Sequence, residues 1–247
     1  MATSDDSPGR GFLDRLFAWY WERRAARATD LSSFRRLALR RRATLDRVAH
    51  RAEQRLAREK EAPLSDDDAI WTLRPEILSL PQSPTIWVNP ESGVRPAPGL
   101  SIYHDGADGA FTLAQRPNRT VSSGQRYELF FESYEFQGAY LSLAINTPPH
   151  LRRPKAGEVL RVEADIAASR TLKTFLRLNI KGAGVSDTLH EDAEAGSGRL
   201  RAEFDMSFAA FEPGENDMIW LDLIFDRPRM VEVAIRDLSL SLCERSA

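Results

Sequence analysis

Residues 172–181 read Leu-Lys-Thr-Phe-Leu-Arg-Leu-Asn-Ile-Lys, and apolar and polar side chains alternate along most of this stretch. Successive side chains of a β-strand point to opposite faces of a sheet, so Leu176, Leu178 and Ile180 are predicted to share the buried face. The opposite face then carries the other set, namely Phe175, Arg177, Asn179 and Lys181.

The same alternation recurs throughout residues 100–247. The runs are 126–131, 139–145, 159–166, 172–181, 200–206, 218–226 and 231–242, and Gly, Pro, Asn or Asp separate them. Seven or more short strands without intervening helices are typical of an antiparallel sandwich. The sequence therefore predicts a mainly β protein, an antiparallel jelly-roll-like β-sandwich over residues 100–247.

An α-helical arm is predicted over residues 1–62, in front of the sandwich. Residues 12–28 place their large apolar side chains on one broad helical arc, and Asp30 or Ser32 can cap a second helix that runs to about Glu61. Apolar residues at heptad-like spacing form a seam along this second helix: Leu31, Phe34, Ala38, Leu45, Val48 and Ala52. Arg41 interrupts the seam, which favours a helical hairpin or a helix docked on a partner over a long coiled coil.

Prolines are frequent in residues 63–99, and this frequency is typical of a wrapping linker. Ser65-Asp-Asp-Asp68 precedes Ala69-Ile-Trp-Thr-Leu73, an arrangement that indicates a helix start. We therefore predict one short helix in the linker, ending before Pro75.

Composition indicates a folded, soluble protein. Of the 247 residues, 42% are hydrophobic and no apolar stretch is long enough to span a bilayer. Cys243 is the single cysteine, which excludes an internal disulfide, and the first eleven residues contain no apolar core of a secretory signal. These features lead us to expect a cytoplasmic protein, with peripheral contact to the inner membrane as an option.

Charge divides the chain into a basic arm and an acidic body. Residues 1–62 hold 15 Lys and Arg and 9 Asp and Glu, which leaves 19 and 27 of the chain's 34 and 36 for the remainder. The arm therefore either meets an anionic partner or lies on the protein's own acidic body.

Several motifs, taken together and in order, resemble a family of alphaproteobacterial proteins of unknown function. They are Trp71-Thr-Leu-Arg-Pro75, His104-Asp-Gly106, Phe136-Gln-Gly-Ala-Tyr-Leu-Ser-Leu143, Phe175-Leu-Arg-Leu-Asn-Ile-Lys181, Ala202-Glu-Phe-Asp-Met-Ser207, Trp220-Leu-Asp-Leu-Ile-Phe225 and Ile235-Arg-Asp-Leu238. The order of strands and turns is also loosely similar to jelly-roll carbohydrate-binding modules and galactose-binding-like domains. That likeness implies a binding fold, which serves many unrelated partners.

The outward side chains of the predicted strands form the main candidate site. Aromatic rings can stack on sugars while charged and amide groups hydrogen-bond their hydroxyls. The predicted ligand-binding residues are Tyr140, Phe175, Arg177, Asn179, Trp220 and Asp222. In the alternative interpretation the helices or the linker cover this face, and Arg177 and Asp222 form a buried ion pair that holds the two layers together.

The stretch His104-Asp-Gly-Ala-Asp-Gly109 contains two carboxylates and two glycines within six residues. It lacks the ligand spacing of an EF-hand loop, so Asp105 and Asp108 are only weak candidates for calcium, and a plain turn is favoured. We expect no cofactor.

Common enzyme motifs are missing, including metalloprotease, serine hydrolase, P-loop and dinucleotide-binding patterns. The least favoured hypothesis is a carboxylate-dependent glycoside hydrolase, in which Asp222 and either Asp165 or Glu163 are the two catalytic carboxylates. The favoured function is non-catalytic recognition of a glycan or glycoconjugate.

The arm supports an alternative function as a structural or adaptor protein. Aromatic residues next to arginines match a helix at a membrane interface, and the candidates are Phe12, Phe17, Trp19, Tyr20 and Trp21. The heptad seam could instead dock a protein partner, and nucleic acid is the least favoured partner because the body is acidic.

Overall fold

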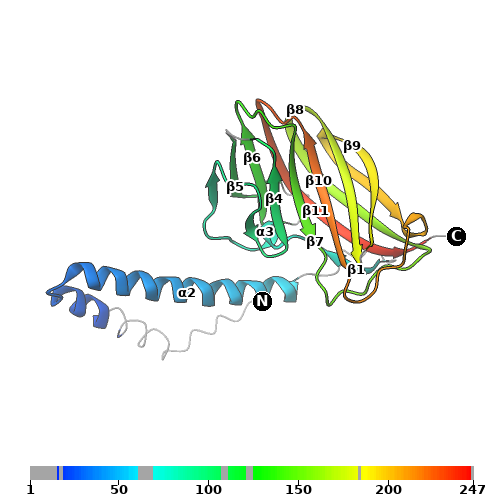
Figure 1. Cartoon of the computed structure of the whole chain (residues 1–247). Coiled ribbons are helices and arrows are strands. Elements are labelled where there is room, and N and C mark those ends of the chain that lie inside the picture. Colours follow the sequence, from blue (N-terminus) through cyan, green and yellow to red (C-terminus); the bar gives the residue numbers. More distant parts are fainter. Residues whose placement is uncertain are drawn as a thin grey trace, which may run out of the picture. The chain divides into compact units, whose positions relative to one another are not determined.

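The protein is represented by a computed structural model that describes residues 16, 19–60, 69–106, 111–120, 125–182 and 185–245 (Figure 1). The chain forms two compact units, Met1–Leu56 and Ala57–Ala247, and each is described by itself.

The larger unit is built from antiparallel strands. They are β1 (Ala69–Leu73), β2 (Ile86–Val88), β3 (Val94–Ala97), β4 (Leu100–His104), β5 (Phe111–Pro117), β6 (Tyr127–Ser133), β7 (Tyr140–Asn146), β8 (Glu158–Gly182), β9 (Val185–Asp205), β10 (Met218–Asp226) and β11 (Val231–Glu244). Two short helices accompany them, α3 (Glu76–Ser79) and the 3-10 turn η1 (Met206–Phe208). The predicted mainly β, antiparallel fold is confirmed.

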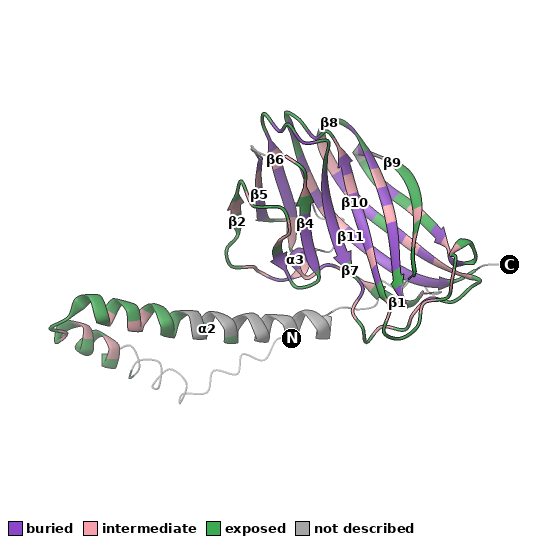
Figure 2. Cartoon of the chain, in the orientation of Figure 1, coloured by how far each residue is buried: buried purple, intermediate pink, exposed green. Residues whose placement is uncertain are grey.

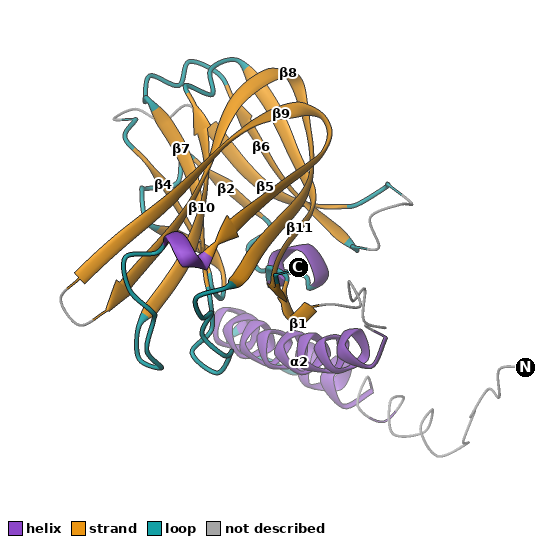
Figure 3. Cartoon of the chain, turned by 90° about the vertical axis from the view of Figure 1, so that its right-hand side faces the viewer, coloured by secondary structure: helices purple, strands orange, loops and turns teal. Residues whose placement is uncertain are grey.

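The strands follow one continuous hydrogen-bonded order, β2-β5-β6-β11-β8-β10-β7-β4-β3, with β1 beside β11 and β9 beside β8. The first half of β8 pairs with β11, and its second half pairs with β10. The ladder between β8 and β9 changes register between Ile166 and Leu172, where the long hairpin arches over (Figure 3). β8 and β9 thereby join a first layer (β2, β5, β6, β11) to a second layer (β10, β7, β4, β3).

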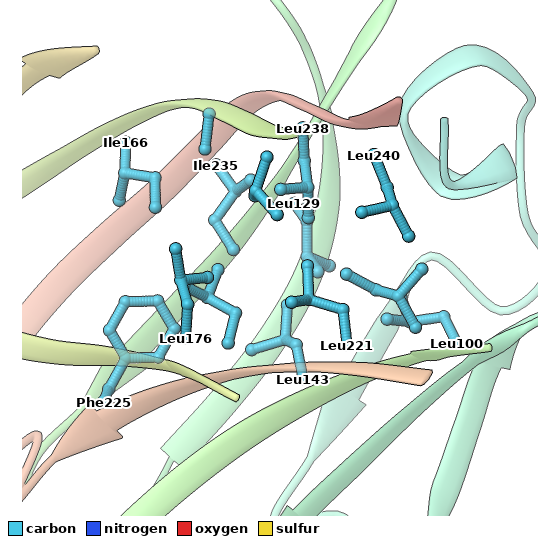
Figure 4. Close-up of a cluster of buried hydrophobic side chains, with 14 of the residues drawn as sticks. Leu100, Leu129, Leu143, Ile166, Leu176, Leu221, Phe225, Ile235, Leu238 and Leu240 are labelled. Atoms are coloured by element: carbon cyan, nitrogen blue, oxygen red, sulfur yellow. The ribbon is translucent and has the colours of Figure 1, made fainter. Parts of the chain in front are cut away.

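The core lies between the two layers (Figure 2). Ile166, Ile235 and Leu238 line the interior from the first layer and face Leu143, Leu176 and Leu221 from the second (Figure 4). Leu176, Leu178 and Ile180 have no exposed surface, so the inward set predicted for residues 172–181 is confirmed.

The helix predicted to end before Pro75 is wrong. Residues 69–73 form β1, which pairs antiparallel with residues 240–243 of β11, and the short helix of this region is α3. Pairing satisfies backbone groups that β11 would otherwise leave open, and Ile70, Trp71 and Thr72 are side chains that strands favour. Residues 65–68 lie outside the described part of the chain.

The proline-rich segment belongs to the folded unit rather than linking to it. It contributes β1, β2 and β3 to the sheet, and α3 buries Ile77 and Leu78 in the core. The amide of Gln115 on β5 donates to the backbone carbonyls of Ile77 and Leu80, both at 2.6 Å, which fixes α3 on the first layer.

The smaller unit contains a helix over residues 19–26 and most of α2 (Leu31–Lys60), as predicted for the arm. Asp30 caps α2 by accepting the backbone N–H groups of Ser32 and Ser33 at 2.9 and 3.0 Å. The Trp21 ring packs on Phe34 with centroids 6.0 Å apart, so the two helices contact each other. No helix in the described residues is long and apolar enough to cross a membrane.

Candidate functional site

The outer side of the second layer carries the candidate residues, and we call it the Asp222 face. It consists of the outward side chains of β4, β7, β10 and the second half of β8: Tyr103, Tyr140, Ser142, Ala144, Phe175, Arg177, Asn179, Trp220, Asp222 and Ile224. All six residues predicted to bind a ligand lie on this one face.

Asp222 is at the centre of the face and is held by its neighbours on β8. Its Oδ2 accepts hydrogen bonds from Arg177 Nε at 3.0 Å, Arg177 Nη2 at 2.7 Å and Asn179 Nδ2 at 2.9 Å. Register explains the contact, because Arg177 is directly opposite Asp222, and Asn179, two residues further along β8, is opposite Trp220 on the same face. No donor to Oδ1 is found among the residues that the structure describes.

Burial differs sharply within this cluster. The side chain of Asp222 is 4% exposed, whereas that of Arg177 is 40% exposed. Asp222 lies between Trp220 and Ile224 on its own strand and opposite the small Ala144 on β7. In the cluster of Arg177, Asn179 and Asp222, the carboxylate is therefore the buried group, and the Arg177 side chain extends from it towards solvent.

Aromatic side chains near Asp222 differ in how far they are exposed to solvent. Trp220 and Phe175 are half-buried, and the Lys173 ammonium lies 4.8 Å from the Phe175 ring centroid. Tyr140 is exposed but is opposite Asp226, four residues along β10 from Asp222 and thus about 13 Å away at the usual rise of a strand. The structure brings Arg177, Asn179, Asp222, Trp220 and Phe175 together and places Tyr140 at the margin.

Tyr103 is a member of the face that sequence reasoning missed. It is 42% exposed and is opposite Ser142 on β7. The alternation of Leu100-Ser-Ile-Tyr-His104 could have placed it on the outer side, but not beside β7, because that neighbourhood depends on strand order.

The ion pair predicted to hold the two layers together has a different role. Arg177 and Asp222 do form a pair, but β8 and β10 are adjacent strands of the second layer. The contact therefore crosses one strand-to-strand ladder rather than the core.

The carboxylate pair proposed for glycoside hydrolysis is wrong. Glu163 and Asp165 are on the first half of β8, paired with Ser239 and Asp237 of β11, and point outward from the first layer. Asp222 points outward from the second layer, so the core separates it from both carboxylates. The arch of β8 causes this separation, and sequence alternation alone does not reveal it.

The first described residues of the His104–Gly109 stretch make structural contacts at the end of β4. Asp105 Oδ1 accepts the backbone N–H of Tyr140 at 3.2 Å, and His104 Nε2 lies 3.0 Å from the carbonyl of Pro90. The second candidate, Asp108, lies outside the described residues. Within the described ranges no group of three or more His, Cys, Asp or Glu could hold a metal ion.

Motifs that are distant in the sequence meet in pairs. Arg74 of the Trp71–Pro75 motif donates to Asp237 of the Ile235–Leu238 motif at 2.7 Å. Arg177 reaches Asp222 in the same way, and Asp105 reaches Tyr140. Side chains of these motifs therefore form hydrogen bonds on or next to neighbouring strands.

Solved structures with similar strand arrangements are remote. The enzymatically active domain of bacteriophage CBA120 tailspike protein 4 has a TM-score of 0.42 at 7% identity, covering 57% of this chain and 19% of that chain. The CBM22-1 xylan-binding domain from Paenibacillus barcinonensis Xyn10C has a TM-score of 0.40 at 10% identity, covering 63% and 92%. The family 11 carbohydrate-binding module from Clostridium thermocellum, in complex with a β-1,3-1,4-mixed-linked tetrasaccharide, has a TM-score of 0.40 at 11% identity, covering 66% and 97%. None of these likenesses is close enough to indicate function.

Sequence comparison places the whole chain more firmly. No curated protein matches it. A family model matches residues 2–247, almost the full length, and its description is a family of unknown function. The motifs quoted above fall within this range, and the predicted membership in such a family is confirmed. The chain belongs to the family of unknown function DUF6478.

Proposed function

We propose that the protein binds a carbohydrate on the Asp222 face without modifying it. The observation that carries the proposal is the state of Arg177, whose guanidinium is fixed by two hydrogen bonds to a buried carboxylate while its side chain is 40% exposed. A donor that is already oriented loses little conformational entropy when it binds a ligand oxygen. These two bonds use one N–H of Nε and one of Nη2, and sugar hydroxyls are suitable acceptors for the N–H groups of Nη1 and the second N–H of Nη2.

The half-buried rings next to Arg177 support the same ligand class. Trp220 and Phe175 flank the cluster from β10 and β8, and the exposed Tyr103 adds a third ring. Aromatic rings give large apolar contact areas at fixed positions, and the C–H faces of pyranose rings can stack on them. A small number of polar groups between apolar walls is typical of small-molecule sites.

Hydrolysis is a weaker proposal for this face. Canonical glycosidases need a second carboxylate about 5–10 Å from the first. Glu163 and Asp165 point away from the opposite layer, and Asp222 Oδ2 already accepts three N–H groups. Asp222 is better suited to orient Arg177 and Asn179 than to transfer a proton.

The test is a glycan array probed with the full-length protein, followed by calorimetric titration of each bound glycan. We expect Trp220→Ala and Arg177→Lys each to weaken binding by about tenfold or more, a change of about 1.4 kcal/mol. Lysine keeps the positive charge of Arg177 but lacks the planar guanidinium. Weaker binding by Arg177→Lys would therefore show that the arrangement of the N–H donors matters as well as the charge.

Tyr134→Ala is the matched control, because Tyr134 is 47% exposed but follows β6 outside the Asp222 face. Thermal melts establish that each variant is folded. A folded wild type that binds no glycan on the array would overturn the proposal, as would variants of Trp220 and Arg177 that bind as tightly as the wild type.

A further inference from the structure

The arm has a strong positive charge that carbohydrate binding by the larger unit does not explain. Residues 19–60 contain 13 Lys and Arg and 5 Asp and Glu, a net charge of +8. The exposed arginines include Arg23, Arg24, Arg35, Arg36 and Arg41. A surface of one sign over a helical unit attracts an anionic partner.

Aromatic rings lie among these arginines at the start of the arm. Trp19 and Tyr20 are 53% and 49% exposed. The Arg23 guanidinium carbon is 4.9 Å from the Trp19 ring centroid, and Arg24 Nη1 donates to Tyr20 Oη at 2.8 Å. Trp and Tyr rings next to cationic side chains are typical of helices that lie at lipid headgroup depth.

α2 adds an exposed apolar stripe. Leu31, Leu45 and Val48 are 67%, 56% and 58% exposed, and their spacing puts them on one side of the helix. By the same spacing Arg36 is on the opposite side, Arg35 is at the flank and Arg41 lies within the stripe. A nucleic-acid backbone would leave the apolar stripe without a partner. A bilayer surface can bind both the apolar side chains and the arginines.

We propose that the arm binds the surface of an anionic phospholipid bilayer. Trp19, Tyr20 and the stripe of α2 enter the headgroup region, and the arginines contact lipid phosphates. A second copy of the arm is a poorer partner, because two copies of residues 19–60, each with a net charge of +8, repel each other. The helices lie on the membrane, since no described helix is suited to span it.

The experiment is vesicle co-sedimentation of the full-length protein. Vesicles of phosphatidylcholine alone are compared with vesicles that also contain phosphatidylglycerol, at low and at raised salt. We expect binding only to the anionic vesicles and release by salt. Arg35→Ala and Arg41→Ala should each lower the partition coefficient by about fivefold, the equivalent of about 1 kcal/mol for a basic residue near such a surface.

The double variant Trp19→Ala and Tyr20→Ala should lower the partition coefficient for anionic vesicles by about tenfold or more, because burial of the aromatic rings is lost while the charge is kept. Matched controls come from the larger unit: Arg95→Ala and Arg199→Ala remove exposed charges, and Phe208→Ala removes a ring that is 78% exposed. Circular dichroism verifies that the helices of each variant are intact.

Equal binding to neutral and anionic vesicles would overturn the proposal, and so would the absence of binding to either. Arm variants that bind as well as their controls would also overturn it. A wild type that sediments as a dimer in free solution, without vesicle binding, would identify a second copy as the occupant of the stripe. The vesicles carry no glycan, so failure here is independent of the carbohydrate proposal.

Discussion

Phe131 and Phe225 meet edge to face across the interior, with ring centroids 5.0 Å apart and ring planes at 65°. Phe131 belongs to β6 in the first layer and Phe225 to β10 in the second. Hydrogen-bonded ladders hold the strands together within each layer. The contact between the two rings instead stabilises the packing of one layer on the other.

Replacing Phe225 with alanine should lower the free energy of unfolding by about 3–5 kcal/mol, because a fully buried ring is lost and a cavity remains. In a double-mutant cycle with Phe131→Ala, the coupling energy should be about 0.5–1.5 kcal/mol. Urea denaturation gives both values. Strictly additive effects would show that the two rings do not stabilise each other, and Phe208→Ala is the exposed control.

The Arg177 and Asp222 pair gives a second prediction about stability. Arg177→Met leaves a buried carboxylate with Asn179 as its remaining donor, which should destabilise the protein by about 1–3 kcal/mol. The exposed guanidinium limits the loss, since water already screens it in part. Arg177→Met combined with Asp222→Leu should cost less than the two single changes added together, and urea titration of all four proteins decides this.

Glycine at position 138 is predicted to be required by packing. A Cβ there would lie 2.5 Å from Asp105 Oδ1, 2.6 Å from Phe136 Cζ and 2.8 Å from the backbone nitrogen of Gly106. Gly138→Ala should therefore lower stability by about 1–3 kcal/mol. Gly214→Ala is the matched control, because its nearest contact is an ordinary 3.6 Å. Similar melting temperatures for the two variants would contradict tight packing of Gly138 against Asp105 and Phe136.

Acid sensitivity should reside partly in Glu203. Hydrogen bonds from Arg201 and Arg161 lower the pKa of this carboxyl below its usual value of 4.5. A lowered folded-state pKa means that the stabilisation is present above about pH 4.5 and is lost as the pH falls through the folded pKa. Glu203→Gln should thus be slightly less stable at neutral pH and less sensitive to acid. Urea midpoints measured from neutral to acidic pH test this, and parallel curves would exclude Glu203 as a contributor.

The N-terminal cap of α2 gives a prediction for the arm. Hydrogen bonds from Ser33 and then Ser32 hold the pKa of Asp30 well below its usual range, so the carboxylate stays ionised in mild acid. Asp30→Ala should reduce helix content, because the N–H groups of Ser32 and Ser33 lose their acceptor. Asp30→Asn should retain most of it. Ellipticity at the helix band measures the effect, and equal signals for alanine and asparagine would contradict the cap.

Local pattern was enough to predict much of the fold. The inward set Leu176, Leu178 and Ile180 follows from the period of two, and the helices of the arm follow from their spacing and from the cap at Asp30. The same alternation assigned all six candidate ligand residues to outward positions. The helix-start signal of Ser65-Asp-Asp-Asp68 gave a wrong prediction for Ala69–Leu73, because pairing with β11 outweighed it.

The sequence by itself determined the face of the strand to which each side chain points, because this alternation depends only on near neighbours along the chain. Tertiary structure alone decided which strands are adjacent, and so it joined Arg177 to Asp222 and placed Glu163 on the far side of the core. The physical reason is that strand order is set by pairing between remote segments, wherever both apolar faces can be buried and every backbone group satisfied.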